Sequence, residues 1–287
     1  MIVGTMNIRG GGRRIKRRRV SHIIKRGMTD IFLIQETKLP LVSYSVAKSF
    51  WGSEGFDFSF SSSEGMSGGL LIIWKSFGME VLCSFKGMGF LGIKVRRHNS
   101  IYYIVNVYSP CSLVLKRELW GNLLRLKSSH SNGDWLIGGD FNAMKDREER
   151  VGRMISSNNI ENREFSKFID ESMLVDVPLK WKKFSWFVGN GKAKSRIDRF
   201  LVADNIIQDW GVVGQFIGNR DISDHCPIWL VLDRDNWGPK PFKCNNEWFS
   251  NKEFIPFVEK EWKAIQVYGR GDFILKEKFR IIKDRLR

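Results

Sequence analysis

The feature that most constrains this fold is a series of short apolar runs of strand length along the first 235 residues. Runs of this kind are typical of strands with at least one buried face. The expected strands are residues 1–7, 31–34, 69–74, 81–85, 91–95, 101–108, 135–140, 184–187, 196–202 and 227–232. Because only loops separate the four runs between residues 69 and 108, we expect those strands to be antiparallel neighbours.

Segments with helical spacing of apolar residues separate other runs. Residues 15–24 carry an apolar stripe that should end near Gly27, and residues 115–126 and 165–169 show the same spacing. A chain that mixes loop-connected strands with helix-connected strands predicts an α/β (α+β) fold. The expected architecture is a four-layer sandwich of two packed mixed β-sheets flanked by helices.

The pattern changes beyond Asp233. Residues 236–241 are rich in helix and strand breakers, whereas residues 254–262 and 273–287 follow helical spacing and carry many basic side chains. We therefore expect one domain over residues 1–235 and a basic helical connector over residues 236–287.

The charge balance limits the class of partner. The 287 residues carry a net charge of +16 and the sequence pI is about 9.8, which favours a polyanionic partner over a membrane surface. No apolar run approaches the roughly 18–20 residues of a membrane helix, so we expect a soluble, intracellular protein. The four cysteines make no zinc spacing, and neither a structural zinc nor a disulfide framework is expected. A monomer is assumed.

Several expected strands end beside polar side chains. Asp224 and His225 precede the last strand, Asp140 and Asn142 end another, and Glu36 ends a third. Taken singly, each carboxylate can be a turn or helix cap, and a lone histidine is commonly structural. Their repeated occurrence at strand ends predicts the rim of an active site.

These residues lie in motifs that resemble, in order, those of the endonuclease/exonuclease/phosphatase (DNase I-like) superfamily. The motifs are Met-Asn7-Ile-Arg-Gly, Ile-Gln-Glu36-Thr-Lys, Asn-Val-Tyr108-Ser-Pro, Gly-Gly-Asp140-Phe-Asn142, Ser-Arg-Ile-Asp198-Arg-Phe and Ser-Asp224-His225. Within it, the chain is similar to the apurinic-type endonuclease domain of plant LINE-type non-LTR retrotransposons, through the Gly-Gly-Leu-Leu-Ile-Ile-Trp74 and Phe-Ser-Trp186 runs. The resemblance implies that residues 236–287 are similar to the connector that precedes a reverse transcriptase, and that this chain is a truncated or domesticated copy.

Phosphodiester cleavage requires a divalent ion, an activated water and donors that neutralise developing charge. Glu36 is an oxygen ligand of the type that Mg²⁺ accepts, and Asn7 and Asp224 are expected to complete the metal shell, with Mn²⁺ as the alternative ion. The resemblance implies that Asp140 orients or deprotonates the water, while Asn142 holds the water or the phosphate.

An imidazolium at His225 would donate to a phosphate oxygen, and Asp198 would orient the ring and raise its pKa. Tyr108 would supply a further hydroxyl donor. The sequence leaves open whether Asp140 or His225 takes the proton of the water, and whether one or two metal ions take part.

A cluster of basic residues follows the first strand. It could contact the phosphate backbone, act as a nuclear localisation patch or form the solvated face of a helix. We favour phosphate contact, with DNA as the partner. The nucleic-acid-binding candidates are Arg13, Arg14, Arg17 and Arg18. Nuclear residence is expected from this substrate and this cluster.

Three residues depart from the pattern of the superfamily, namely Met6, Arg9 and Ser185, and none of them removes a catalytic side chain. The preferred function is a Mg²⁺-dependent endonuclease that nicks DNA and leaves a 3′-hydroxyl for a linked reverse transcriptase. The alternatives are a phosphatase or phosphodiesterase acting on small phosphoesters, and an inactive nucleic-acid-binding relic.

Overall fold

The computed structural model describes residues 1–64, 67–130, 132–152, 159–189, 191–232, 248 and 251–286. The chain divides into two compact units, residues 1–235 and residues 236–287. The breaker-rich segment 236–241 lies outside the described residues. In the described part of the chain, no helix combines the length and the apolar character that crossing a membrane requires.

The first unit contains a seven-stranded mixed sheet with the order β11-β15-β16-β1-β2-β4-β3. The neighbours β1 and β2 are parallel, as are β11 and β15, and the remaining neighbours are antiparallel. The strands are β1 (Val3–Asn7), β2 (Ile31–Gln35), β3 (Phe56–Glu64), β4 (Ser67–Lys75), β11 (Leu179–Lys180), β15 (Val212–Ile217) and β16 (Ile228–Leu232).

The second sheet has six strands in the order β10-β14-β8-β7-β6-β5. They are β5 (Glu80–Gly87), β6 (Phe90–Arg97), β7 (Ser100–Tyr108), β8 (Asp134–Asp140), β10 (Val175–Asp176) and β14 (Asp198–Val202). The prediction of four antiparallel neighbours between residues 69 and 108 is wrong for the first of them. Strand β4 pairs with β2 and β3, because the chain crosses to the second sheet after Lys75 and only β5, β6 and β7 form the antiparallel run.

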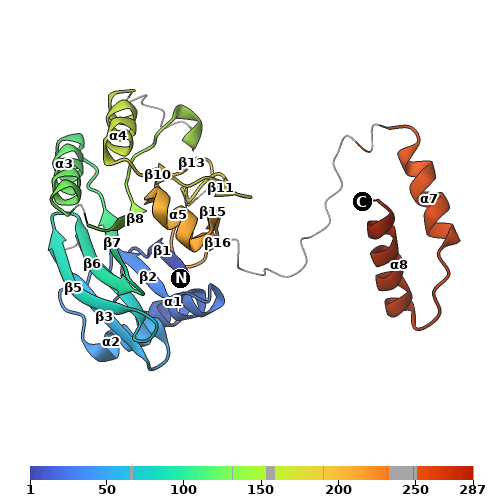
Figure 1. Cartoon of the computed structure of the whole chain (residues 1–287), viewed down its shortest axis with the longest axis horizontal. Helices are drawn as coiled ribbons and strands as arrows, with labels where there is room; N and C mark the ends of the chain where they lie inside the picture. The colour runs from blue at the N-terminus through green and yellow to red at the C-terminus, as the bar shows by residue number, and fades with distance from the viewer. Residues whose placement is uncertain are drawn as a thin grey trace. The chain divides into compact units, whose positions relative to one another are not determined.

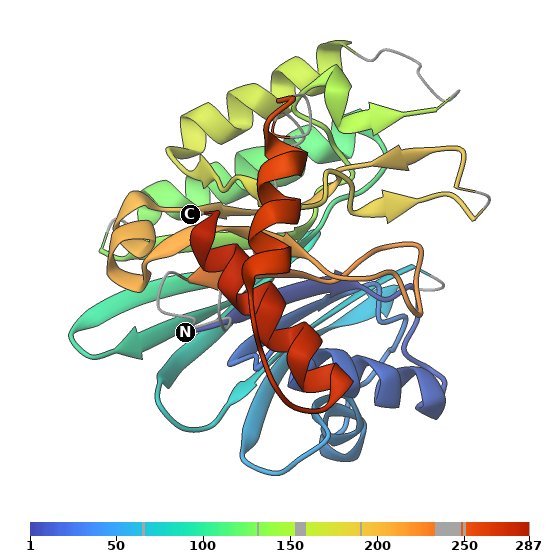
Figure 2. The same cartoon turned by 90° about the vertical axis from the view of Figure 1, so that its right-hand side faces the viewer.

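The two sheets pack face to face, and helices cover the outer face of each. Strand β2 shows why: Ile31 and Leu33 point into the core between the sheets, whereas Phe32 and Ile34 point into a core beneath helices α1 (Arg14–Arg26) and α2 (Tyr44–Trp51). On the far side, helices α3 (Leu113–Ser129) and α4 (Asn159–Ser172) cover β7 and β8. Figures 1 and 2 show these layers. The predicted sandwich of two mixed sheets flanked by helices is confirmed.

Smaller elements complete the first unit. Strands β9 (Arg150–Val151), β12 (Trp186–Phe187) and β13 (Lys194–Ser195) form a three-stranded sheet, preceded by the 3₁₀ turn η1 (Arg147–Glu149). Helix α5 (Asp204–Trp210) links β14 to β15. The second unit contains α7 (Phe254–Ala264) and α8 (Gly271–Arg285), which contact each other through the rings of Trp262 and Phe279.

Candidate active site

The polar residues predicted at strand ends come together at one end of the sandwich, where strand ends of both sheets lie close to one another. In the six-stranded sheet, Tyr108 and Asp198 are both in register with Asp140, which lies between them. In the other sheet, Asn7 and Gln35 are paired at the carboxyl ends of β1 and β2, and His225 lies shortly before β16. Packing the sheets face to face therefore places side chains from both sheets around Asp140.

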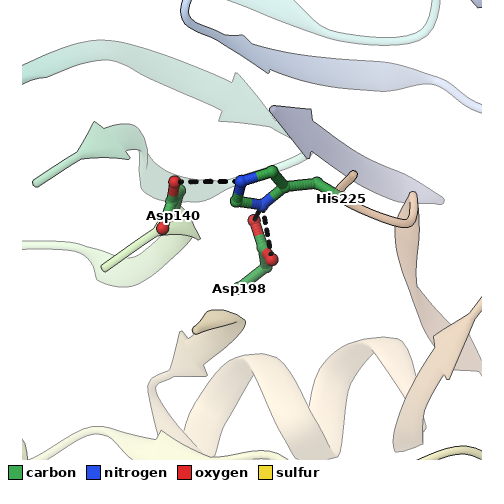
Figure 3. Close-up of side chains that lie close together, drawn as sticks. All are labelled: Asp140, Asp198 and His225. Carbon is green, nitrogen blue, oxygen red and sulfur yellow. Dashed lines mark hydrogen bonds and ion pairs between the residues drawn. The ribbon is translucent and has the colours of Figure 1, made fainter. Parts of the chain in front are cut away.

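Asp140 is held on both carboxylate oxygens. Its Oδ2 atom accepts a hydrogen bond from Asn7 Nδ2 at 2.9 Å and lies 3.8 Å from Nε2 of His225. Its Oδ1 atom accepts the backbone N–H of Asn142 at 2.9 Å. Asp140 itself is only 1% exposed. Figure 3 shows Asp140 facing the ring of His225.

His225 is oriented by Asp198 on the opposite side of the ring. Nδ1 lies 2.9 Å from both carboxylate oxygens of Asp198, so the ring is fixed with Nε2 directed at Asp140 (Figure 3). Asp198 is itself anchored, because its backbone N–H donates to Oγ of Ser185 at 3.1 Å. Ser185, one of the three residues that depart from the superfamily pattern, therefore anchors Asp198 through its hydroxyl.

The electrostatics of this group separate the roles of Asp140 and His225. Burial raises the pKa of Asp140 to about 6, with a further contribution from the charge of Asp198, although the imidazolium and the hydrogen bonds from Asn7 and Asn142 oppose it. Burial alone would lower the pKa of His225, but the charges of Asp198 and Asp140 and the Asp198 hydrogen bond raise it to about 9. Near pH 7.5, Asp140 is therefore a carboxylate and His225 an imidazolium.

Asn142 is positioned by a constrained backbone. Its φ of 45° is left-handed, a conformation that asparagine tolerates better than most residues. Its side-chain Nδ2 donates to the carbonyl of Ser109 at 2.7 Å, and its own carbonyl accepts from the buried Nζ of Lys116 at 2.5 Å. Gly139 precedes this turn because a Cβ there would lie 2.1 Å from the carbonyl oxygen of Val107. The carboxamide is thus fixed beside Asp140.

Glu36 and Asp224, two of the predicted metal ligands, share a cation supplied by the chain. Arg9 Nη1 lies 2.5 Å from Asp224 Oδ2, and Arg9 Nε lies 3.8 Å from Glu36 Oε2. Lys38 Nζ lies 3.0 Å from the other oxygen of Glu36. Nδ2 of Asn7, the third predicted ligand, donates to Asp140, and its Oδ1 accepts the backbone N–H of Arg9. Glu36 and Asp224 both offer carboxylate oxygens, which are the ligands that a hard divalent ion prefers.

A second group of potential ligands lies deeper. Among the described residues, Asp140, Asp198 and His225 offer three ligand atoms that all lie within 4.8 Å of one another. This group could bind a metal ion when the ring of His225 is neutral. The raised pKa, about 9, favours the protonated ring, which would have to lose a proton before one of its nitrogens could bind a metal. The oxygen donors Glu36 and Asp224 are the better candidates for a metal under these conditions.

Tyr108 remains a hydroxyl at physiological pH. Burial, followed by the charges of Glu36 and Asp140, raises its pKa well above the ordinary value of 10.0. The phenol is half-buried and directly opposes Asp140 in the register of β7 and β8. It can therefore donate a hydrogen bond at this edge.

The basic cluster divides between structural and exposed side chains. Arg17 donates to Ser49 Oγ and to the carbonyls of Gly11 and Gly12, so its guanidinium makes hydrogen bonds within the fold, and the phosphate contact expected of it stays a prediction. Arg13, Arg14 and Arg18 are exposed. A cavity of about 710 Å³ lies beside Arg9, and its lining includes Arg13, Lys16 and Arg19.

Sequence reasoning misses three residues that shape the site. Arg9 stands out in the sequence only as a departure from the superfamily pattern, although its place two residues after Asn7 puts it at the same strand end. Trp186 fits a core position by its apolar neighbours, yet its Nε1 donates to Asp224 at 2.9 Å. Lys116 lies on the buried stripe of α3 with Leu119 and Leu123, and a lysine at that helical position is the signal of a buried cation.

Comparison with known proteins agrees with this geometry. Residues 4–225 match the model of the endonuclease/exonuclease/phosphatase family. The chain belongs to this family. Its members act on phosphoester bonds, so this endonuclease/exonuclease/phosphatase domain is a hydrolase of that class. A search of curated protein sequences gave no match.

Solved structures resemble the domain in fold. An AP endonuclease from Leishmania major is 19% identical with a TM-score of 0.64, covering 80% of this chain and 86% of that one. The endonuclease domain of TRAS1, a telomere-specific non-LTR retrotransposon, is 14% identical with a TM-score of 0.60, covering 82% and 99%. A 3′ phosphatase from Neisseria bound to a product DNA hairpin is 15% identical with a TM-score of 0.62, covering 81% and 99%. At these identities the likeness establishes the fold.

Proposed function

We propose that this chain is a divalent-metal-dependent endonuclease that hydrolyses phosphodiester bonds of DNA. The observation that carries the proposal is the opposition of Asp140 and His225, 3.8 Å apart and oppositely charged near neutral pH. A base and a cationic donor at this distance suit hydrolysis at phosphorus, because one removes a proton from water while the other neutralises charge on the phosphate.

The proposed step uses the chain's own groups as follows. Asp140 accepts the proton of a water molecule that Asn142 helps to hold, and the water oxygen forms a bond to phosphorus. The imidazolium of His225 donates to a non-bridging oxygen, while Tyr108 donates a further hydrogen bond. The bond from phosphorus to the 3′-oxygen breaks, and this oxygen takes a proton from solvent water, which leaves a 3′-hydroxyl and a 5′-phosphate. Asp198 and Asn7 keep the two reacting side chains aligned.

A divalent ion would be held by Glu36 and Asp224 in place of the Arg9 guanidinium. When bound, Mg²⁺ or Mn²⁺ supplies a Lewis acid for the phosphate oxygens. The choice of DNA as substrate is supported by the net charge of +16 and by the basic cavity beside Arg9. A retrotransposon origin, of the plant LINE type, is supported by the quoted motifs and by the fold likeness to TRAS1. In that context residues 236–287 would form a connector to a reverse transcriptase, and the protein would act in the nucleus.

The test is nicking of supercoiled plasmid by the purified chain with Mg²⁺, with Mn²⁺ and with EDTA. Asp140→Asn and His225→Gln preserve side-chain size, and each should lower the nicking rate by about 10²-fold or more. Metal-dependent conversion to open circles by the wild type alone supports the proposal. Turnover of a small phosphoester without nicking, or salt-sensitive DNA binding without any hydrolysis, would overturn it in favour of a phosphatase or a binding relic.

A further inference from the structure

Trp181 is an exposed aromatic residue in a backbone conformation that does not suit it. It directly follows β11, its φ is 69°, and 67% of its surface is exposed. A left-handed backbone disfavours bulky side chains, and an exposed indole gains little from burial. Its ring meets that of Phe216 edge to face, with 5.5 Å between centroids, but most of the indole remains open. Neither the core nor the proposed reaction accounts for this residue.

The sheet topology places Trp181 at the same edge as the active site. Strand β11 is parallel to β15, β15 is antiparallel to β16, and β16 is antiparallel to β1, so β11 and β1 run in the same direction. The carboxyl end of β11, which Trp181 follows, and the carboxyl end of β1, which is Asn7, therefore lie at the same edge of the sheet. Three strand spacings, or about 14 Å, separate the two strands, and the register places Lys180 level with Gly4, so Trp181 lies about two residues short of Asn7 along the strand direction. Since a DNA strand rises about 3.4 Å per nucleotide, this distance is roughly four nucleotide steps.

The surroundings of Trp181 suit a nucleic-acid strand. Lys180, Lys182 and Lys183 flank the indole, and all three are exposed. Lys182 Nζ donates to the carbonyl of Gly218 and to Asn219 Oδ1, both at 2.8 Å, which ties the segment to the loop that leads to His225. Trp181, Lys182 and Lys183 also line a cavity of about 360 Å³. An aromatic platform beside cations is the combination that binds bases and phosphates together.

We propose that Trp181 stacks on a base of the DNA substrate, roughly four nucleotides from the scissile phosphate, while Lys180 and Lys183 contact adjacent phosphates. The inference rests on the proposed function for the choice of DNA. It adds a substrate-binding residue outside the group around Asp140, and it explains why a tryptophan occupies a left-handed position on the surface.

The experiment measures binding of fluorescein-labelled DNA by anisotropy in EDTA, so that cleavage is not required. A duplex and a duplex with an unpaired segment are compared, because an indole stacks only on a base that has left the duplex stack. Trp181→Gly removes the ring and suits the left-handed backbone; it should weaken binding about tenfold, whereas Trp181→Phe should retain most of the affinity. The control is Phe77→Ala. Phe77 is 87% exposed but follows β4, which runs antiparallel to β2 and so ends at the opposite edge; the affinity of this variant should be unchanged.

A scan of abasic positions along the duplex identifies the stacked base. The wild type should lose affinity at one position near the fourth nucleotide from the cleavage site, and Trp181→Gly should be insensitive there. Equal affinity of Trp181→Gly and wild type, or loss in the Phe77 control of the same size, would overturn the inference. Plasmid nicking is measured separately. If the wild type nicks plasmid but Trp181→Gly binds DNA as the wild type does, only this inference is rejected. If binding depends on Trp181 but the wild type does not nick plasmid, only the proposed function is rejected.

Discussion

Arg9 and Asp224, 215 residues apart in the chain, are joined by a contact of 2.5 Å between Nη1 and Oδ2. The same guanidinium lies 3.8 Å from Glu36, so one side chain neutralises both carboxylates that are proposed to hold a divalent ion. Arginine is permanently charged and must leave these oxygens before a metal ion can bind them. The apparent affinity for the metal therefore includes the cost of displacing Arg9.

Arg9→Ala should consequently bind Mn²⁺ more tightly, by about three- to tenfold given the modest strength of a half-exposed ion pair. Isothermal titration calorimetry in the absence of DNA measures this directly. Arg18→Ala removes an exposed arginine of the neighbouring helix and serves as the charge-matched control. If both variants bind Mn²⁺ as the wild type does, Arg9 does not compete for the metal site.

Asp198→Asn should lower the pKa of His225 from about 9, because the substitution removes the charge and weakens the hydrogen bond that favour the imidazolium. Titration of the imidazole C–H resonances by NMR gives the value, and the chain has only four histidines, so the other three provide internal references. The nicking rate of the variant should fall by about 10²-fold near neutral pH. A His225 resonance that titrates as in the wild type would rule out this role for Asp198.

Much of this fold is predictable from the sequence because each buried face imposes a period on the chain. Alternating residues of β2 enter two different cores, and the polar residues that end such strands point to Asp140 and His225 as members of the site. Strand β15 escapes prediction because Gly214 and a register shift interrupt its apolar pattern. The pairing of Arg9 with Asp224 is not predictable from the sequence, since it depends on how β1 and the loop before β16 meet in space.

Lys116→Met should destabilise the fold by about 3–5 kcal/mol, because it leaves Glu161 unpaired in a largely buried setting and the carbonyl of Asn142 without its donor. Chemical denaturation measures the change in the free energy of unfolding. The adjacent Arg117 makes a similar bridge from α3 to α4, with Glu164, but on the exposed surface. Arg117→Met should cost about 0–1 kcal/mol. If the two variants lose the same free energy of unfolding, the buried bridge stabilises the fold no more than the exposed one.

Glu149 tests the pH dependence of stability. It lies between the guanidinium groups of Arg196 and Arg199, the second of which is fully buried. Burial alone would raise the pKa of Glu149, but the charge and hydrogen bonds of Arg199, followed by the charge of Arg196, hold it below its ordinary value of 4.5. A depressed folded-state pKa stabilises the fold above the unfolded-state pKa, and this contribution disappears as the pH falls through the folded-state value.

Glu149→Gln should therefore cost about 3–5 kcal/mol near pH 7, where it leaves buried arginine charge without one of its partners. The difference from the wild type should shrink as the pH falls below about 4, because protonation removes the same charge from the wild-type residue. Urea denaturation across this range measures both values. Glu148→Gln changes the neighbouring exposed carboxylate, which lies 3.4 Å from Lys183, and should have little effect at any pH. A cost for Glu149→Gln that stays constant down to about pH 3 would contradict the assignment of the stabilisation to its charge.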